Sequence, residues 1–367
     1  MKKLYSSVIY ENPLPQLRSR QSAFPGLCIL NDGTFLATHQ IGEAFESVDG
    51  TTYISMSYDG GKSFGDPLLA FDKSDETIVA TDNGKPTLLP DGRIAIFGYM
   101  FYRENPDLPI GNPETGGLLY DDVYISFSED GGKTFGKRNV VKTSFGNSIE
   151  ASAPLTVLKD GSLASPITCF PEWDGSLKHR NCGRLLRSYD GGVTFEDTVV
   201  CTAFPSDNVT CYEQRMCETE GGIIAVISWN ENISTGERMN NHITLSLDNG
   251  KSFSAPIDTG IHGQASSIIS LEDNKVMTIH AVRRDTDDPG IYCAIADLTG
   301  GKWNMLSLEK IWSPDVPVSK RANMAEIFSY LKFGQPSGVI TEDNKLIVTH
   351  WECKDGQYRT LVNAFEL

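Results

Sequence analysis

Two glutamates stand in sequence contexts that suit acid–base chemistry. Glu213 is followed two residues later by Arg215 on the same expected strand face, and this cation is expected to keep the carboxylate ionised. Glu150 lies among small and apolar residues in segment 148–154, where loss of water is expected to raise the pKa of its carboxyl. A protonated carboxyl and an ionised carboxylate are the pair that cleavage of a glycosidic bond requires. Glu213 suits a nucleophile or a base that activates one, and both the retaining and the inverting geometry are compatible with this pair.

Other polar and aromatic residues occur where the expected strands begin and end. They form a set of candidate substrate contacts: Arg20, Arg215, Arg283, Arg284, Trp229, Gln335, Trp351, His39 and Glu46. Aromatic rings beside polar groups suit the apolar face of a sugar. Each member also has an ordinary structural explanation, because charged residues at strand ends are often simply solvated, and tryptophan and histidine often pack in protein cores.

Four copies of one motif, S-x-D-x-G-x-[ST]-F, divide the chain into similar lengths. They occupy residues 57–64, 128–135, 188–195 and 246–253, and their starts are 71, 60 and 58 residues apart. In such a motif the Asp accepts backbone N–H bonds across a tight turn, the Gly adopts a positive φ, and the aromatic ring packs beneath the hairpin. A weaker fifth copy occupies residues 297–303. This spacing indicates a repeated supersecondary unit.

A second hairpin, made of two short apolar strands and a tight turn, accompanies each repeat. Its turns fall at Asp32-Gly33, Asp91-Gly92, Asp160-Gly161, Glu220-Gly221, Asp273-Asn274 and Asp343-Asn344. Six such hairpins in 367 residues predict six four-stranded units without a long helix. We therefore expect an all-β fold, a six-bladed β-propeller formed by residues 1–367 as a single domain. Residues 3–10 are expected to pair with residues 358–366 and so to close the last blade.

This topology is expected to place the candidate residues on one face. If the turns within both hairpins of every blade point to one side of the disc, the starts of the first strands gather on the other side, together with the loops after the second strands. Glu150, Glu213 and Gln335 belong to strand starts, whereas Glu46 and Trp229 follow second strands or end them. We expect this face to hold the binding site, with Glu150 and Glu213 directed into it from adjacent blades.

The repeated motif resembles the Asp-box, or BNR, repeats of the sialidase superfamily of glycoside hydrolases, and the resemblance covers nearly the whole chain. It is specific for the fold and weak for the substrate, because Asp-boxes also occur in propellers that are not enzymes. The resemblance implies a site with three arginines for the carboxylate of sialic acid. It also implies an Asp acid/base in a loop of the first blade and a Tyr nucleophile assisted by a Glu. Glu213 matches the assisting Glu.

Other positions depart from that family pattern. Ala23-Phe24-Pro25 stands where the family has Arg-Ile-Pro, Trp229 replaces the second arginine, and Gln335 stands at the Tyr position. Nearby residues that could take over these roles are Arg18 or Arg20, Arg238, Arg283 or Arg284, Tyr330, and, for the acid/base, Glu43, Glu46 and Asp49. The chain therefore resembles an atypical member, similar to relatives in the superfamily that cleave other sugars with two glutamates.

These observations favour a glycoside hydrolase that acts on the ends of oligosaccharides and uses Glu213 with Glu150. Two main alternatives stay open. An exo-α-sialidase would need Arg20, Arg238 and Arg284 to rebuild the carboxylate clamp. A non-catalytic propeller would bind a glycan or a protein through the same residues, and a propeller lyase is a more distant third alternative.

Composition narrows the range of partners. The chain has 32 Lys and Arg against 48 Asp and Glu, a net charge of −16, which disfavours nucleic acids and anionic membranes. No apolar run reaches the roughly 20 residues of a membrane-spanning helix. The eight cysteines lack metal-ligand spacing and no glycine-rich phosphate loop precedes a helix, so neither a metal nor a cofactor is expected. Residues 1–13 lack the apolar core of a signal peptide, which predicts a cytoplasmic location.

Overall fold

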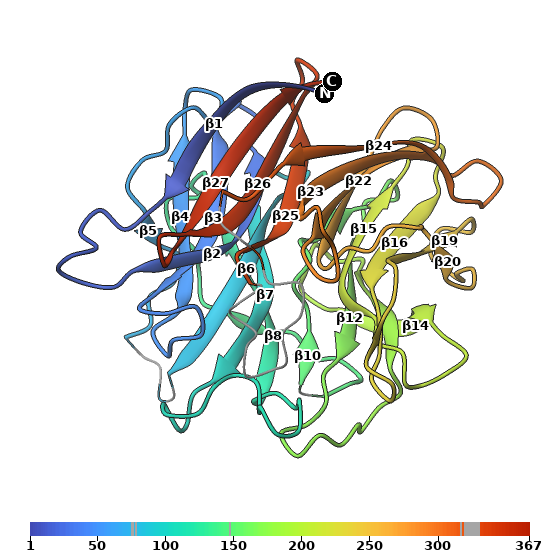
Figure 1. Ribbon diagram of the computed structural model, residues 1–367, viewed down its shortest axis with the longest axis horizontal. Helices are drawn as coiled ribbons and strands as arrows, with labels where there is room; N and C mark the ends of the chain where they lie inside the picture. The colour runs from blue at the N-terminus through green and yellow to red at the C-terminus, as the bar shows by residue number, and fades with distance from the viewer. Residues whose placement is uncertain (75–76, 78, 147, 316–317, 319–330) are drawn as a thin grey trace.

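The computed structural model describes the whole chain apart from residues 75–76, 78, 147, 316–317 and 319–330 (Figure 1). Within this described part, strands and turns are the only regular structure, and the strands form six antiparallel sheets of four or five strands around a central axis, with one additional two-stranded hairpin. Each of the six sheets is one blade. The predicted all-β, six-bladed β-propeller is therefore confirmed.

The first three blades follow one another along the chain. Blade I contains β2 (Gln21–Ile29), β3 (Phe35–Gly42), β4 (Thr51–Ser57) and β5 (Leu68–Leu69). Blade II contains β6 (Ala80–Leu88), β7 (Ile94–Tyr102), β8 (Asp121–Ser128) and β9 (Asn139–Val140). Blade III contains β10 (Ile149–Glu150), β11 (Thr156–Val157), β12 (Leu163–Cys169), β13 (Cys182–Ser188) and β14 (Glu196–Ala203). Its first strand is divided, because β10 and β11 pair with different parts of β12.

The other three blades complete the ring. Blade IV contains β15 (Tyr212–Glu218), β16 (Ile224–Trp229), β19 (His242–Ser246) and β20 (Ile257–Asp258), with a small extra hairpin of β17 (Glu231–Asn232) and β18 (Glu237–Arg238). Blade V contains β21 (Ser266–Ser270), β22 (Lys275–Val282), β23 (Gly290–Asp297) and β24 (Asn304–Trp312). Blade VI contains β25 (Phe333–Ile340), β26 (Lys345–Lys354), β27 (Gln357–Glu366) and the N-terminal strand β1 (Lys2–Tyr10).

The last blade joins the two ends of the chain. Strand β1 pairs antiparallel with β27, in a register that runs from Lys2 opposite Glu366 to Tyr10 opposite Thr360. Figure 1 shows the N- and C-termini side by side at the outer edge of this blade. The pairing predicted between these two segments is present, and it provides the fourth strand that blade VI would otherwise lack.

A hydrophobic cluster fills each boundary between neighbouring blades. Between blades II and III, for example, Phe97 and Ile125 pack with Ile149 and Leu163. Equivalent clusters lie at the other five boundaries of the described structure. Because most strands are covered on both faces, they read as nearly continuous apolar runs rather than as strict alternations.

The four S-x-D-x-G-x-[ST]-F segments form the turns between the third and fourth strands of blades I to IV. In the first, Asp59 Oδ1 accepts backbone hydrogen bonds from Lys62 and Ser63, both at 3.0 Å, and a side-chain bond from Ser57 Oγ at 2.8 Å. The same pattern recurs around Asp130, Asp190 and Asp248. These aspartates hold turns and lie at the opposite end of the blades from the candidate site residues.

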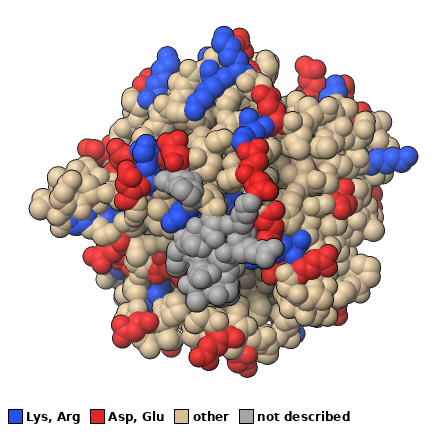
Figure 2. Space-filling model, in the orientation of Figure 1, with Lys and Arg blue, Asp and Glu red and all other residues tan. Residues whose placement is uncertain are grey.

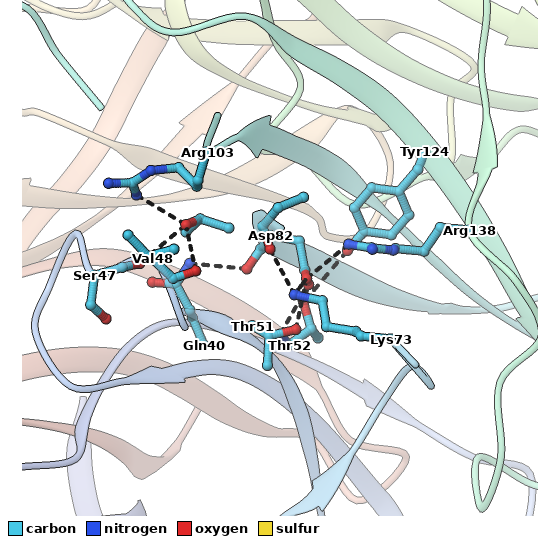
Figure 3. Close-up of polar contacts among 12 residues, drawn as sticks. Gln40, Ser47, Val48, Thr51, Thr52, Lys73, Asp82, Arg103, Tyr124 and Arg138 are labelled. Carbon is cyan, nitrogen blue, oxygen red and sulfur yellow. Dashed lines mark hydrogen bonds and ion pairs between the residues drawn. The ribbon is translucent and has the colours of Figure 1, made fainter. Parts of the chain in front are cut away.

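A buried carboxylate connects blades I and II (Figure 3). Asp82, on β6, accepts hydrogen bonds from Thr51 Oγ1 at 2.7 Å and from Thr52 through its backbone N at 2.9 Å and its Oγ1 at 2.7 Å. Arg138 Nη1 and Lys73 Nζ lie 2.9 and 3.0 Å from Asp82 Oδ2. The Asp82 side chain is fully buried, whereas Lys73 is 21% exposed, so the cluster fixes the two blades against each other through a carboxylate that water does not reach.

The surface carries both signs of charge. Figure 2 shows acidic side chains distributed over the visible face, with lysines and arginines among them, rather than gathered in one large patch. Among the residues that the structure describes, no helix is long and apolar enough to cross a membrane.

Candidate active site

The candidate site lies at one end of the central axis, where the first strands of the blades begin. Backbone kinks occur at the same place in three blades: Phe24, Glu213 and Gln335 have positive φ values of 55, 44 and 42°. The pairing register shifts at each of these points, as in a β-bulge. A bulge redirects the side chain of its extra residue, so these three side chains leave the regular alternation of their strands. We term this end of the axis, defined by Phe24, Glu213 and Gln335, the mouth.

Glu213 is held by two neutral donors at the mouth. Trp229 Nε1 donates a hydrogen bond to its Oε2 at 2.7 Å, and Gln335 Nε2 donates to its Oε1. Trp229 ends the second strand of the same blade, whereas Gln335 comes from blade VI. The carboxylate is therefore fixed from two blades and remains partly exposed.

Arg215 is not the ion-pair partner that the sequence predicts for Glu213. The bulge at Glu213 breaks the expected alternation, and the guanidinium of Arg215 instead donates from Nη1 to Ser152 Oγ at 2.9 Å and to the carbonyl oxygen of Gln214 at 2.8 Å. Arg215 is 93% buried and lines a cavity of about 320 Å³ along the central axis. Arg215 therefore lies too deep to contact a substrate bound at the mouth.

Lys85 supplies a second buried cation behind the mouth. Its Nζ donates to the carbonyl oxygens of Phe24 and Pro25, the second at 3.2 Å. Burial is the main cause of a pKa well below the usual value of lysine, and the nearby Arg215 lowers it further, while Glu213 opposes the shift. The lysine thus anchors the bulge of blade I beneath the mouth.

Glu150 lies beneath the mouth and is closed off from it. Its Oε1 accepts a hydrogen bond from the backbone N of Ser152 at 2.9 Å, and its Oε2 is buried without a partner among the described residues. Burial raises the pKa of this carboxyl, as its sequence context predicts, with Arg215 opposing the shift. Glu213 also raises it, so the two glutamates are near each other, but only Glu213 is accessible.

Glu46 occupies the loop between β3 and β4 of blade I. Its carboxyl is partly buried, and this burial raises its pKa, while the charge of Arg103 acts in the opposite direction. Arg103 Nη1 also donates to the backbone carbonyl of Glu46 at 3.1 Å, which fixes the loop. In the same loop Glu43 is exposed, and Asp49 forms an ion pair with Arg20, with 3.0 Å between Asp49 Oδ2 and Arg20 Nη1. Arg20 is therefore engaged with its own blade rather than directed into the mouth.

Three further candidates are too deeply packed to contact a substrate in this structure. Trp351 is 1% exposed and packs in a cluster with Phe24, Phe45 and Tyr358. Arg283 stacks over the Trp351 ring at 5.6 Å and donates to Gln264 Oε1 at 2.9 Å and to the carbonyl oxygen of Phe333.

His39 is the third of these candidates, and it is fully buried between Ser22 Oγ and Ser55 Oγ, at 3.0 and 3.1 Å. Burial lowers its pKa to about 3, so the ring is neutral. In this structure Trp351, Arg283 and His39 contact other side chains and backbone groups in the protein interior.

Arginines and acids gather beside Trp229. Arg284 lies over the Trp229 ring at 5.1 Å, and its Nη1 is 3.5 Å from Glu231 Oε2. Arg238, on β18, forms an ion pair with Asp285 at 3.1 Å. These residues make the blade IV and V side of the site charged. Tyr330, the alternative nucleophile, lies outside the described residues.

Sequence reasoning missed Asp121, which lies close to Glu150. Its Oδ1 accepts a hydrogen bond from the backbone N of Ile149 at 2.7 Å, and burial raises its pKa well above the usual value. No local signal marks it, because it is the first residue of β8 and comes near Glu150 only through contact between blades. Among the described residues, no group of three or more His, Cys, Asp and Glu side chains could hold a metal ion.

Comparison with known proteins links this fold to sialidases. No protein-family model matches the sequence, and no match was found among curated proteins. A solved protein of unknown function from Dyadobacter fermentans is 18% identical and aligns with a TM-score of 0.75, covering 100% of this chain and 99% of that one.

Two sialidases align over most of this chain. The NanB sialidase from Streptococcus pneumoniae is 12% identical, with a TM-score of 0.68 over 98% of this chain and 70% of that one. The Hadza microbial sialidase Hz136 is 15% identical, with a TM-score of 0.63 over 95% of this chain and 66% of that one. At these identities the likeness concerns the fold, and the chain therefore has the six-bladed β-propeller fold of these sialidases.

Proposed function

We propose that the protein is a glycoside hydrolase that cleaves a sugar at the mouth of the propeller, with Glu213 as the reacting carboxylate. The observation that carries the proposal is the placement of Glu213 at a backbone bulge, between the indole of Trp229 and the amide of Gln335. Both donors are neutral N–H groups, which bind a carboxylate without giving it a proton. A partly exposed carboxylate fixed in this way suits attack on a sugar or activation of a water molecule.

Gln335 distinguishes this site from the one implied by the sialidase resemblance. That resemblance places a Tyr nucleophile at this position, and an amide cannot take over its role, because it has no ionisable hydroxyl. In the proposed reaction the reacting group is instead the carboxylate of Glu213, to which Gln335 donates a hydrogen bond. This supports a substrate other than the usual sialoside.

We assign the proton donor to Glu46 rather than to Glu150. Glu46 is only partly buried, and burial raises its pKa, which is the direction that favours a proton donor. Glu150 also has a raised pKa, but neither of its oxygens is open to the mouth. In this proposal Glu150 is a buried neighbour of Glu213 with a raised pKa rather than the group that touches the sugar.

The test is hydrolysis of aryl glycosides by the wild type and by Glu213→Gln and Glu46→Gln. The panel comprises an arabinofuranoside, a rhamnoside, a fucoside and a sialoside. Glu213→Gln is expected to reduce kcat by at least about 10³-fold. Glu46→Gln should slow substrates with poor leaving groups by about 10²–10⁴-fold and activated aryl leaving groups much less, because a good leaving group needs little protonation.

Glu104→Gln is the control, since it changes an exposed acid in the corresponding loop of blade II. Unaltered turnover in Glu213→Gln would refute the assignment of the reacting carboxylate. An equal loss for all leaving groups in Glu46→Gln would refute its role as the acid.

An exo-α-sialidase is the second candidate, favoured by the arginines beside Trp229. Arg284 lies against this ring and Arg238 is near it through Asp285, so two cations border the site. In that case the sialoside is the substrate that turns over, and Arg284→Gln raises its KM. Hydrolysis of a neutral glycoside alone favours the first proposal. Binding of a glycan without turnover would instead support the non-catalytic propeller.

A further inference from the structure

A continuous row of aromatic side chains leads away from Glu213 across three blades. Trp229 of blade IV contacts Tyr212, with ring centroids 5.3 Å apart, and Tyr212 contacts Phe170 of blade III at 5.7 Å. Phe170 in turn contacts Tyr99 of blade II at 6.5 Å. We term these four residues, Tyr99, Phe170, Tyr212 and Trp229, the aromatic shelf.

The rings of the aromatic shelf are more exposed than the ring of Trp351. All four side chains of the shelf are only partly buried, whereas Trp351 is 1% exposed. The four come from different segments, at β7, directly after β12, and at the paired ends of β15 and β16. A row of partly exposed rings at one edge of a site is unusual for a soluble surface without a ligand, and it suits the apolar face of a sugar.

The two tyrosines add polar groups to this surface. Neither the Tyr99 nor the Tyr212 hydroxyl has a hydrogen-bond partner among the described residues, although buried or half-buried tyrosine hydroxyls usually find one. Burial raises the pKa of both phenols, and the nearby carboxylates act in the same direction, so both hydroxyls stay protonated and can donate. Two unused hydroxyls between aromatic rings fit the alternating hydroxyl and C–H groups of a pyranose or furanose.

We infer that the aromatic shelf binds the second sugar residue of an oligosaccharide, next to the residue that is cleaved at Glu213. This inference rests on the proposed function for the position of the cleaved bond. The shelf begins at Trp229, which is hydrogen-bonded to Glu213, so a chain that enters the mouth reaches the shelf within one residue. A second group of partly exposed rings, Phe24, Phe45 and Tyr358, packs on the buried Trp351, whereas the aromatic shelf begins at a ring that donates a hydrogen bond to Glu213.

The substrate class that follows is a neutral oligosaccharide of at least two residues. The four side chains of the shelf are uncharged, although Arg284 lies over the Trp229 ring at 5.1 Å, and their polar groups are two hydroxyls and one indole N–H already bonded to Glu213. A simple glycoside or a monosaccharide would leave Tyr99 and Phe170 without contacts. Chain length, rather than the identity of the terminal sugar alone, should therefore determine affinity.

The test measures binding, so that it does not depend on turnover. Fluorescently labelled Glu213→Gln protein is applied to an array of neutral oligosaccharides of one to four residues. The Kd values of the best-bound disaccharide and its terminal monosaccharide are then measured by titration calorimetry. The disaccharide is expected to bind at least about tenfold more tightly than the monosaccharide.

Conservative variants show whether the shelf is responsible. Tyr99→Phe with Tyr212→Phe, in the Glu213→Gln background, keeps the rings and removes only the hydroxyls. It should weaken the disaccharide about tenfold and leave the monosaccharide unchanged. Tyr189→Phe is the matched control, because Tyr189 is exposed on a turn at the other end of blade III. Phe170→Leu removes one ring and should also weaken the disaccharide selectively.

The outcomes separate this inference from the proposed function. A disaccharide preference that is lost in the hydroxyl variants supports the shelf even if the wild type hydrolyses nothing. Hydrolysis without any such preference overturns the shelf and leaves the proposed reaction intact. An array without bound oligosaccharides, or a double variant that binds like its parent, also overturns the inference.

Discussion

Replacing Asp82 by Asn tests whether the buried ion-pair cluster between blades I and II is required for stability. The substitution keeps the size of the side chain and removes its charge. Arg138, whose side chain is 8% exposed, and Lys73 then lose their shared partner. An amide also presents an NH₂ group to at least one of the donors that now point at a carboxylate oxygen (Figure 3).

The expected cost follows from the burial of this site. Removing one member of a buried ion pair costs about 3–5 kcal/mol. An unfolding entropy of about 2.1 cal/mol/K per residue over 367 residues amounts to about 0.8 kcal/mol/K. The melting temperature of Asp82→Asn should therefore fall by about 4–6 °C, measured by thermal unfolding followed by circular dichroism.

An exposed ion pair provides the matched control. Asp91 lies 2.7 Å from Arg93, with side-chain exposures of 53 and 28%, and Asn is accepted in its turn. Exposed pairs contribute about 0–1 kcal/mol, so Asp91→Asn should lower the melting temperature by no more than about 1 °C. An Asp82→Asn protein that melts with the wild type, or an equally large effect of Asp91→Asn, would refute the reasoning.

Three further predictions concern pH and the mouth. The buried rings of His39, His280 and His350 have pKa values lowered to about 3, so the unfolded chain binds protons that the folded chain does not, and stability should fall as the pH drops from about 6.5 toward 3. Urea midpoints between pH 8 and 5 measure this, and a flat profile would contradict it. Hydrogen bonds to Thr194 and Ser252 lower the pKa of Asp190 and Asp248 to about 2, so the stability that these carboxylates provide is present above about pH 4 and lost between pH 4 and 2. Asp190→Asn should flatten this acid limb in the same titration. Gln335→Ala should reduce kcat about tenfold with an unchanged melting temperature, since it removes one of the two donors that position Glu213, and a wild-type kcat would contradict that role.

The fold could be predicted almost completely from the sequence, because its signals are local. Each turn aspartate, such as Asp59, bonds to backbone groups within four residues, so the chemistry of the turn is visible as a short motif. The paired ends of the chain follow from counting strands, since five complete blades leave one that needs a partner. The divided first strand of blade III coincides with Pro154, between β10 and β11, which has no N–H to donate to a strand ladder.

The site could be predicted only in part, because its contacts join blades. Glu213 and Gln335 were identified separately as strand-start residues, but their hydrogen bond crosses 122 positions. The expected pairing of Glu213 with Arg215 failed because a bulge breaks the alternation on which it relied. Trp351 and Arg283 lie near strand ends, as Trp229 does. Which of these side chains is buried depends on how the neighbouring loops pack, and the sequence pattern does not show this.

The pairing of β1 with β27 has a consequence for synthesis on the ribosome. Residues 2–10 are synthesised long before residues 357–366 and have no partner strand until these emerge, so blade VI cannot be completed before β27 has been made. Of the nine residues of β1, Ile9 alone is fully buried, and Lys2 and Lys3 keep its outer end hydrophilic. A strand of this composition can stay unpaired in water without aggregating. The last step of folding is then the pairing of β1 with β27, after both segments have emerged from the ribosome.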